Sequence, residues 1–288
     1  MPTPMNVVVE MLRMADVSAR DTVYDLGSGD GRLPITAARL YGARGVGVEL
    51  DSGLVARSRR HARRAGVDSL VRFVRGDLFE TDLRPATVVT LYLFPGMNER
   101  LRPRILRQME PGDRVVAHDF SMGDWEADSV ARVPEENPTL DVFGEVSPLG
   151  EWEGFGGAEA GVDSLIRELN QVGGRATVYR WVIPSDIGGT WRVSLPSGGS
   201  ARLRIDQRFQ ELRAHAAGET LDGVASARVR ADTVELRLRT ADGRLLRLTG
   251  TADGGRMGGE DAGGRPWTAR RVADSDASIL EWEGSAGP

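Results

Sequence analysis

The chain has 288 residues, of which 40% are hydrophobic and 27% charged, and its formal net charge is −5. This length and composition are typical of a globular protein with one large domain or two smaller ones. Cysteine is absent, which excludes disulfides, thiolate metal ligands and thiol catalysis, and three widely separated histidines do not favour a metal site, so we expect none. The acidic balance argues against a nucleic-acid partner, and we see neither a membrane-spanning run nor a secretory signal, so we expect a cytoplasmic protein.

The first 125 residues alternate between short apolar strands and helices. Valine- and leucine-rich strands separated by helices indicate an α/β fold with a mostly parallel sheet covered on both faces. The strands are predicted at residues 22–27, 45–51, 71–77, 86–94 and 113–120, and the helices at 32–42, 53–66 and 101–110.

Two later changes of pattern divide the chain further. Residues 126–174 form an insert rich in glycine, proline and acids, in which only 163–174 are predicted to be helical, and 176–184 provide a last strand. From residue 185 the chain alternates polar and apolar residues with period two between turn signals, which indicates a small antiparallel β-barrel or sandwich. We therefore predict a ligand-binding domain over 1–184 and a β-domain over 185–288.

The stretch "VYDLGSGDGR" places three glycines, Gly27, Gly29 and Gly31, between a predicted strand and a helix. Doubly wound sheets bind ligands at this position, but a dinucleotide fold would show the spacing G-x-G-x-x-G. Asp25 and Asp30 would repel a pyrophosphate, and the chain has no lysine to offset them. A cationic ligand without phosphate fits better, and S-adenosyl-L-methionine has this character.

Two further acids follow the next two predicted strands. Glu49 lies about 20 residues after the first glycine, where an acid holds ribose hydroxyls. Asp77 ends the third strand and is placed to accept a hydrogen bond from the adenine amino group. Together with the glycine loop, these acids predict a site for S-adenosyl-L-methionine.

Residues 1–125 resemble a class I S-adenosylmethionine-dependent methyltransferase. The stretches "DLGSGDGR", "GVGVELD", "GDLF", "YLFPGMNERLRP" and "RVVAHDFSMGDW" resemble the bacterial relatives of the mitochondrial ATP synthase c-subunit lysine methyltransferase. The resemblance implies a Rossmann-like sheet and a segment at residues 2–4 that closes over the cofactor. The cofactor-binding residues that it implies are Thr3, Asp25, Gly27, Ser28, Gly29, Gly31, Glu49, Leu50, Asp77 and Leu78.

The methyl acceptor should lie at the end of the fourth strand, where this chain has "YLFPGMN". Enzymes that methylate planar amides or base nitrogens commonly carry (D/N)-P-P-(Y/F) there, so an aliphatic amine is favoured. The candidate catalytic residues are Tyr92, Asn98 and His118, and the candidate pocket residues are Pro95, Asp119 and Trp125. Tyr92 and Trp125 could instead be core aromatics, Asn98 a helix cap and His118 a structural residue.

The leading functional prediction is a protein-lysine N-methyltransferase. The alternatives are a methyltransferase for a metabolite or natural product, and a non-catalytic cofactor-binding protein whose β-domain docks a partner. The loop spacing disfavours a nicotinamide dehydrogenase. The arginine-rich stretch 57–64 is interpreted as the solvated face of a helix, and the sequence leaves the oligomeric state open.

Overall fold

The structure is a computed structural model that describes residues 2–135, 174–218 and 220–273. The chain divides into two compact units, residues 1–181 and 182–288, which are described separately below. The helix predicted at 163–174 lies almost wholly outside the described residues.

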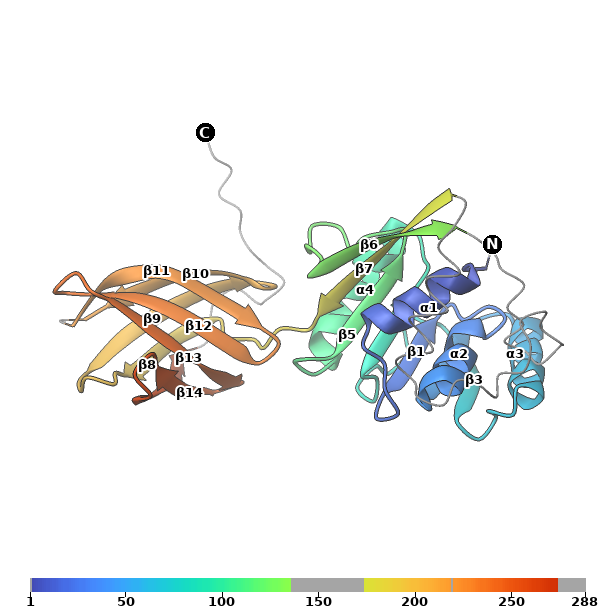
Figure 1. Cartoon of the computed structure of the whole chain (residues 1–288), viewed down its shortest axis with the longest axis horizontal. Helices are drawn as coiled ribbons and strands as arrows, with labels where there is room; N and C mark the ends of the chain where they lie inside the picture. The colour runs from blue at the N-terminus through green and yellow to red at the C-terminus, as the bar shows by residue number, and fades with distance from the viewer. Residues whose placement is uncertain (1, 136–173, 219, 274–288) are drawn as a thin grey trace. The chain divides into compact units, whose positions relative to one another are not determined.

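The first unit contains a seven-stranded sheet with the order β3-β2-β1-β4-β5-β7-β6 (Figure 1). Its strands are β1 (Thr22–Leu26), β2 (Arg44–Glu49), β3 (Val71–Arg75), β4 (Val88–Leu91), β5 (Arg114–His118), β6 (Ser129–Glu135) and β7 (Gly174–Val182). The pairs from β3 to β5 are parallel, and β6 pairs antiparallel with β7. The strand order reverses between β1 and β4, and this is the point at which doubly wound sheets bind ligands. The predicted class I methyltransferase fold is confirmed.

Helices cover both faces of this sheet. They are α1 (Met5–Met14), α2 (Arg32–Tyr41), α3 (Ser52–Arg64) and α4 (Pro95–Gln108). Helix α2 contacts both α1 and α3 on one face. From β1 the chain adds β2 and β3 on one side of the sheet, whereas from β4 it adds β5 on the other side. Because crossovers between parallel strands are right-handed, helix α4, which joins β4 to β5, lies on the opposite face from α2 and α3 (Figure 1).

Helix α1 was not predicted from the sequence. It contains three consecutive valines, and its N-cap Pro4 offers no capping side chain. Eight of its ten residues are buried, and it contacts α2, β5 and β6. Tertiary burial therefore stabilises a helix whose local signals are weak. The prediction also missed β6 and began α4 six residues late, at 101 instead of Pro95.

An ion-pair network connects the N-terminal ends of the central strands, which are the ends remote from the glycine loop. The Asp21 carboxylate accepts hydrogen bonds from Arg114 Nη2 at 2.7 Å and from Thr87 Oγ1 at 2.7 Å. Burial alone would raise the pKa of Asp21, but the hydrogen bonds from Thr87, Ser18 and Arg114 outweigh it and lower this pKa. The network ties the N-terminal ends of β1, β4 and β5 together.

The second unit is an eight-stranded antiparallel sheet with the order β10-β9-β8-β15-β14-β13-β12-β11. Its strands are β8 (Gly189–Ser194), β9 (Ser200–Arg208), β10 (Glu211–Ala217), β11 (Leu221–Arg230), β12 (Thr233–Thr240), β13 (Leu245–Asp253), β14 (Arg256–Asp261) and β15 (Pro266–Ala273). Strands β10 and β11 contact each other and share a bridge between Gly218 and Leu221, so the sheet nearly closes into a barrel. The predicted antiparallel β-domain is confirmed as barrel-like.

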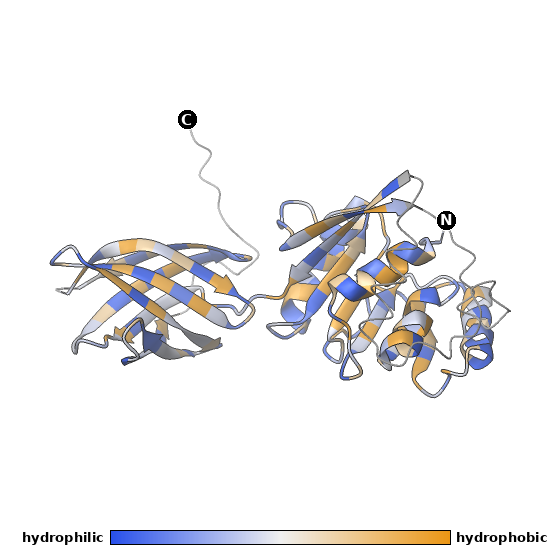
Figure 2. Ribbon diagram, viewed as in Figure 1, coloured by the Kyte–Doolittle hydropathy of each residue, from blue (hydrophilic) through white to orange (hydrophobic). Residues whose placement is uncertain are grey.

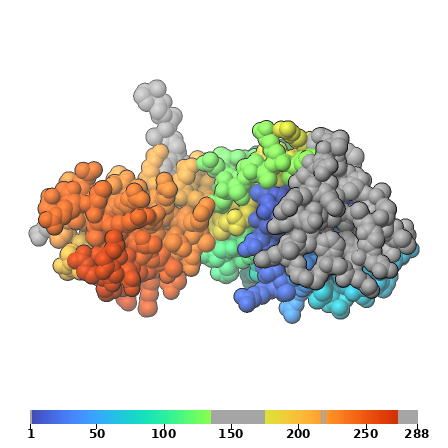
Figure 3. Space-filling view, in the orientation of Figure 1, coloured from blue at the N-terminus to red at the C-terminus, as the bar shows by residue number. Residues whose placement is uncertain are grey.

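Hydrophobic and hydrophilic residues alternate along the strands of this unit (Figure 2), and the hydrophobic side chains fill the interior of the barrel. Along β9 the exposed and buried residues alternate, with Leu203 and Ile205 fully buried. Trp191 and Trp267 also lie in the core, where their indole N–H groups donate to backbone carbonyls. The face of this unit seen in Figure 3 is a continuous packed surface.

Candidate functional site

The glycine loop joins β1 to α2 and adopts a backbone that only glycine accommodates easily. Gly27, Gly29 and Gly31 have φ values of 82°, 56° and 85°, in the left-handed region. A Cβ atom on Gly31 would lie 2.6 Å from the Phe73 ring, so a side chain there is excluded by packing. A Cβ atom on Gly29 would extend into open space, so the loop is packed from behind and open in front.

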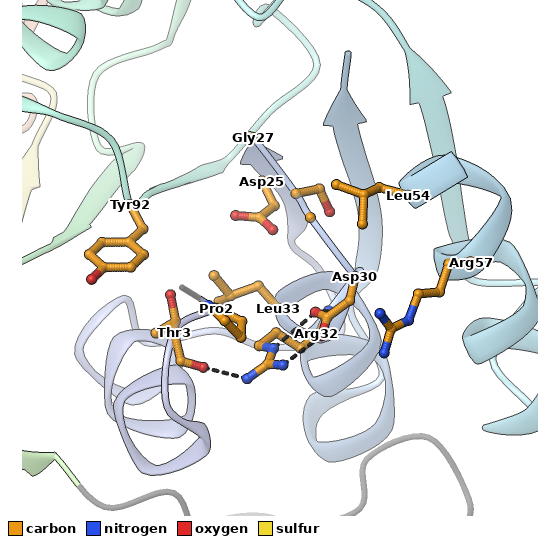
Figure 4. A pocket seen from close by; sticks show the side chains of 12 residues that line it. Pro2, Thr3, Asp25, Gly27, Asp30, Arg32, Leu33, Leu54, Arg57 and Tyr92 are labelled. Atoms are coloured by element: carbon orange, nitrogen blue, oxygen red, sulfur yellow. Dashed lines mark hydrogen bonds and ion pairs between the residues drawn. The ribbon is translucent and has the colours of Figure 1, made fainter. Parts of the chain in front are cut away.

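A cavity of about 350 Å³ opens over this loop (Figure 4). Asp25 and Tyr92 stand on its walls, and Pro2 and Thr3 come from the N-terminal segment. Its other lining residues are Gly27, Ser28, Gly29, Asp30, Arg32, Leu33, Leu54 and Arg57. Of the predicted cofactor residues, Thr3, Asp25, Gly27, Ser28 and Gly29 therefore share one cavity.

Asp25 is the buried acid of the cavity. Its carboxylate accepts a hydrogen bond from Thr90 Oγ1 at 2.8 Å, across the β1–β4 pair. Burial raises the pKa of Asp25 to about 7, and the nearby charges of Asp30 and Glu49 add to the effect. The ionised carboxylate is therefore costly in the free protein, and a cation bound in the cavity would stabilise it.

Asp30 has a different environment, because Arg32 neutralises it. Arg32 donates from Nε to Asp30 Oδ1 at 2.9 Å and from Nη2 to Asp30 Oδ2 at 2.5 Å, and from Nη1 to the Thr3 carbonyl at 2.7 Å. Burial would raise the pKa of Asp30, but the hydrogen bonds and charge of Arg32 outweigh it and lower this pKa. The sequence predicted two carboxylates beside the loop without a cation; in the described part of the chain Asp30 is paired with Arg32, whereas Asp25 has no ion pair.

Arg32 also positions the N-terminal segment. Its bond to the Thr3 carbonyl holds residues 2–4 against the glycine loop (Figure 4), and Thr3 is 5% exposed. The predicted covering segment thus lies beside the loop in this structure.

The two acids predicted for the ribose and the adenine lie farther along the sheet edge. Glu49 Oε2 accepts a hydrogen bond from the Gly29 amide at 2.9 Å, so the end of β2 is tied to the glycine loop. Asp77 lines a second cavity of about 380 Å³. The adjoining leucines differ: Leu50 is 69% exposed, and Leu78 is partly buried.

The acceptor side of the cavity begins at Tyr92. The Tyr92 ring stacks on the His118 ring with centroids 4.0 Å apart. His118 is 1% exposed, and burial lowers its pKa despite the charge of Asp119, so its imidazole is neutral at physiological pH. His118 therefore lies behind Tyr92 and supports that ring instead of facing the cavity.

Asn98 is neither a helix cap nor exposed to the cavity. It is completely buried in α4, and its Nδ2 donates to the carbonyls of Phe120 at 3.0 Å and Ser121 at 3.3 Å. The side chain therefore clamps the loop after β5 onto α4.

The three predicted pocket residues separate in the structure. Pro95 is exposed at the first position of α4, where proline fits without loss of a hydrogen bond. Asp119 has φ 61° and its Oδ1 accepts from the Thr177 amide at 2.9 Å, which fixes the turn after β5. Trp125 does not line the cavity: it is 1% exposed, and its carbonyl accepts from Trp181 Nε1 at 2.9 Å. The prediction that Trp125 belongs to the substrate pocket is therefore corrected: Trp125 is a core residue.

Among the described residues, no helix is long and apolar enough to span a membrane, and no cluster of histidine and acid side chains could hold a metal ion.

Comparisons with known proteins place this site in a family. Residues 25–129 match the family model of the ANTKMT methyltransferase domain. A protein-lysine N-methyltransferase of Saccharolobus islandicus is 40% identical over 143 residues, which cover 49% of this chain and 89% of that enzyme. The chain belongs to this protein-lysine N-methyltransferase family.

Other relatives align over less of their length. The mouse adenine nucleotide translocase lysine N-methyltransferase is 37% identical over 105 residues, and the match spans 36% of this chain and 45% of the mouse enzyme. The chain is also similar to a solved structure, the crystal structure of an RNA methyltransferase from Salinibacter ruber in complex with S-adenosyl-L-homocysteine, with 44% sequence identity. The match covers 65% of this chain and 96% of the Salinibacter chain, with a TM-score of 0.49.

The methyltransferase is S-adenosyl-L-methionine-dependent, and its cavity suits that cofactor. Among the described residues, no ion pair is found for the buried Asp25, so its carboxylate suits a ligand that carries an ammonium, and the open space in front of Gly29 leaves room for close approach to the backbone. Sequence reasoning missed Arg32, Thr90 and Phe120. Arg32 follows the glycine loop directly, and this position was a signal that it could pair with Asp30; the partners of Thr90 and Phe120 are distant in sequence and gave none.

Proposed function

We propose that this methyltransferase transfers a methyl group to the ε-amino group of lysine in a protein substrate. The observation that carries the proposal is the cavity between the glycine loop and Tyr92, in a chain that covers 89% of an archaeal protein-lysine N-methyltransferase. When bound, S-adenosyl-L-methionine supplies a methyl group: the lysine ammonium first loses a proton to water, the amine nitrogen then bonds to the methyl carbon as the bond to sulfur breaks, and S-adenosyl-L-homocysteine is left.

Within this proposal each part of the site has a distinct task. Asp25 balances the ammonium of the cofactor, and Glu49 accepts hydrogen bonds from the ribose hydroxyls. The loop 27–31 lets the cofactor approach its backbone closely and offers backbone amides as hydrogen-bond donors. Asp77, Leu50 and Leu78 contact the adenine. Tyr92 flanks the approach of the amine, and orienting the amine in line with the methyl supplies much of the acceleration.

The test uses cofactor labelled in its methyl group and lysate of the source cell. We expect label in a discrete protein band, loss of that label when lysines are first acetylated, and methyl-lysine in the digested band by mass spectrometry. The Asp25→Asn variant at the same concentration serves as the control and should label weakly. Label found in RNA or in the small-molecule fraction, or tight cofactor binding without any transfer, would contradict the proposal.

We further propose a cytoplasmic location and a protein partner in place of a nucleic acid. Fractionation of the source cell with antibody detection tests the location, since recovery in the membrane pellet after a salt wash would contradict it.

A further inference from the structure

A row of aromatic side chains runs from the cofactor cavity to the protein surface. Tyr92 lines the cavity, and its ring lies 6.3 Å from the Phe120 ring, at an interplanar angle of 16°. The Phe120 ring in turn lies 6.0 Å from that of Phe94. Phe94 is 73% exposed, more than any other large apolar side chain in the described part of the chain.

The structure holds the middle of this row in place. Asn98 clamps the Phe120 carbonyl onto α4, and the left-handed turn at Asp119 is fixed by the Thr177 amide. Strained backbone that is held from two sides is typical of functional sites. The surface position of Phe94 has no such internal explanation, because exposing a large apolar ring gains nothing for the fold.

We propose that Tyr92, Phe120 and Phe94, the aromatic row, bind the side chain of the substrate lysine and favour its methylated forms. The inference rests on the proposed function for the identity of the amine. Aromatic faces attract cations through the ring quadrupole and also pack against methylene groups. The aliphatic stem of lysine lies along Phe94 and Phe120 while its nitrogen is in the cavity beside Tyr92, and between transfers the ammonium itself rests on the faces of Phe94 and Phe120.

The chemistry of the row determines which amines it binds best. Phe94 and Phe120 have no hydrogen-bonding group, so binding to them does not depend on the number of N–H protons of the amine. A methylated ammonium is less strongly hydrated than a primary one and loses less on contact with an apolar surface. The row consequently retains mono- and dimethyl-lysine while S-adenosyl-L-homocysteine is exchanged for new cofactor and the methylated ammonium gives its next proton to water, so more than one methyl group can be added before the product is released.

The test measures binding and requires no turnover. Saturation-transfer NMR on the full chain with bound S-adenosyl-L-homocysteine compares choline, which carries a trimethylammonium group, with 3,3-dimethylbutan-1-ol, its uncharged isostere. We expect choline to bind about two- to fivefold more tightly than the isostere. Phe94→Leu and Phe120→Leu, which keep an apolar side chain, should each reduce this preference toward one.

Phe79→Leu is the matched control, because the Arg100 guanidinium already lies 3.8 Å from the Phe79 ring centroid. This variant should retain the choline preference, and S-adenosyl-L-homocysteine should raise the melting temperature of all three variants as in the wild type. Equal binding of the two probes, or a preference that survives both substitutions in the row, would overturn the inference. A choline preference with no methylation of lysine would contradict the proposed function alone.

Discussion

Cofactor binding should strengthen with pH because of Asp25. Burial raises the pKa of this carboxyl to about 7 in the free protein, so it is largely protonated at pH 6 and largely ionised at pH 8. The ammonium of S-adenosyl-L-homocysteine stays charged over this range and favours the ionised carboxylate. Since the folded pKa is raised, the free protein also loses stability as the pH rises from about 4 to about 7, and the ligand restores it.

The magnitude follows from the ionised fraction. With a pKa of about 7, roughly a tenth of Asp25 is ionised at pH 6 and roughly nine tenths at pH 8, so affinity should rise about tenfold. Binding should release about half a proton at pH 7. Asp113, whose pKa burial raises to about 6, precedes β5 at the far end of that strand and does not line the cavity.

Isothermal titration of the full chain with S-adenosyl-L-homocysteine at pH 6, 7 and 8 measures the affinity, and two buffers of different ionisation enthalpy measure the proton release. Asp25→Asn keeps the size of the side chain but removes its titration, so its affinity should be weaker at pH 8 and nearly constant with pH. An affinity of the wild type that is constant between pH 6 and 8, or a tenfold rise that persists in Asp25→Asn, would refute the assignment of Asp25 to the cofactor ammonium.

Four further predictions test other parts of the molecule. Glu49→Ala removes charge-assisted hydrogen bonds of about 1.5–3 kcal/mol each, so cofactor affinity should fall tenfold or more in calorimetry with little change in melting temperature; unchanged affinity would contradict the ribose assignment. Arg32→Ala should speed hydrogen exchange at the Val8 amide, which donates to the Pro4 carbonyl at 2.9 Å, because loss of the bond to the Thr3 carbonyl loosens this segment; exchange equal to the wild type would contradict it. Trp125→Ala should lower the free energy of unfolding in urea by about 3–5 kcal/mol, because Trp125 is a core residue. A much smaller decrease would indicate that Trp125 instead lies exposed in the acceptor site. The chain shortened to residues 1–184 should unfold cooperatively and be stabilised by S-adenosyl-L-homocysteine, while its methylation of the natural substrate falls by more than its cofactor affinity; an insoluble fragment would show that the β-domain is needed for folding.

The sheet and the glycine loop could be predicted from the sequence because their signals are local. Buried parallel strands are short continuous apolar runs, and left-handed backbone at Gly27, Gly29 and Gly31 requires glycine. The period-two alternation likewise predicted the β-domain, although β14 (Arg256–Asp261), which contains two adjacent glycines, has a weak strand signal. The domain boundaries predicted from composition remain a proposal.

The features that could not be predicted depend on contacts between distant residues. Helix α1 is stable because it is buried against β5, β6 and α2, not because of its propensity. Trp125 is a core residue because of Trp181, 56 positions away, and Asn98 is a clamp because of Phe120, 22 positions away. A single sequence gives the residue types of such pairs but not their separation in space.

The charge arrangement of the site explains why two aspartates so close together can serve one ligand. Asp30 has its own cation, Arg32, and that pair also holds the N-terminal segment, so its charge is already used in the free protein. Asp25 has a hydroxyl donor, Thr90, which stabilises it less than a cation would, and its raised pKa reflects that difference. Of the two aspartates that flank the loop, Asp25 is therefore the one without an ion pair among the described residues, and it lies buried in a cavity with glycine backbone beside it. A ligand with one ammonium and no phosphate satisfies that arrangement, whereas a dinucleotide would place its pyrophosphate against an acid that no cation offsets.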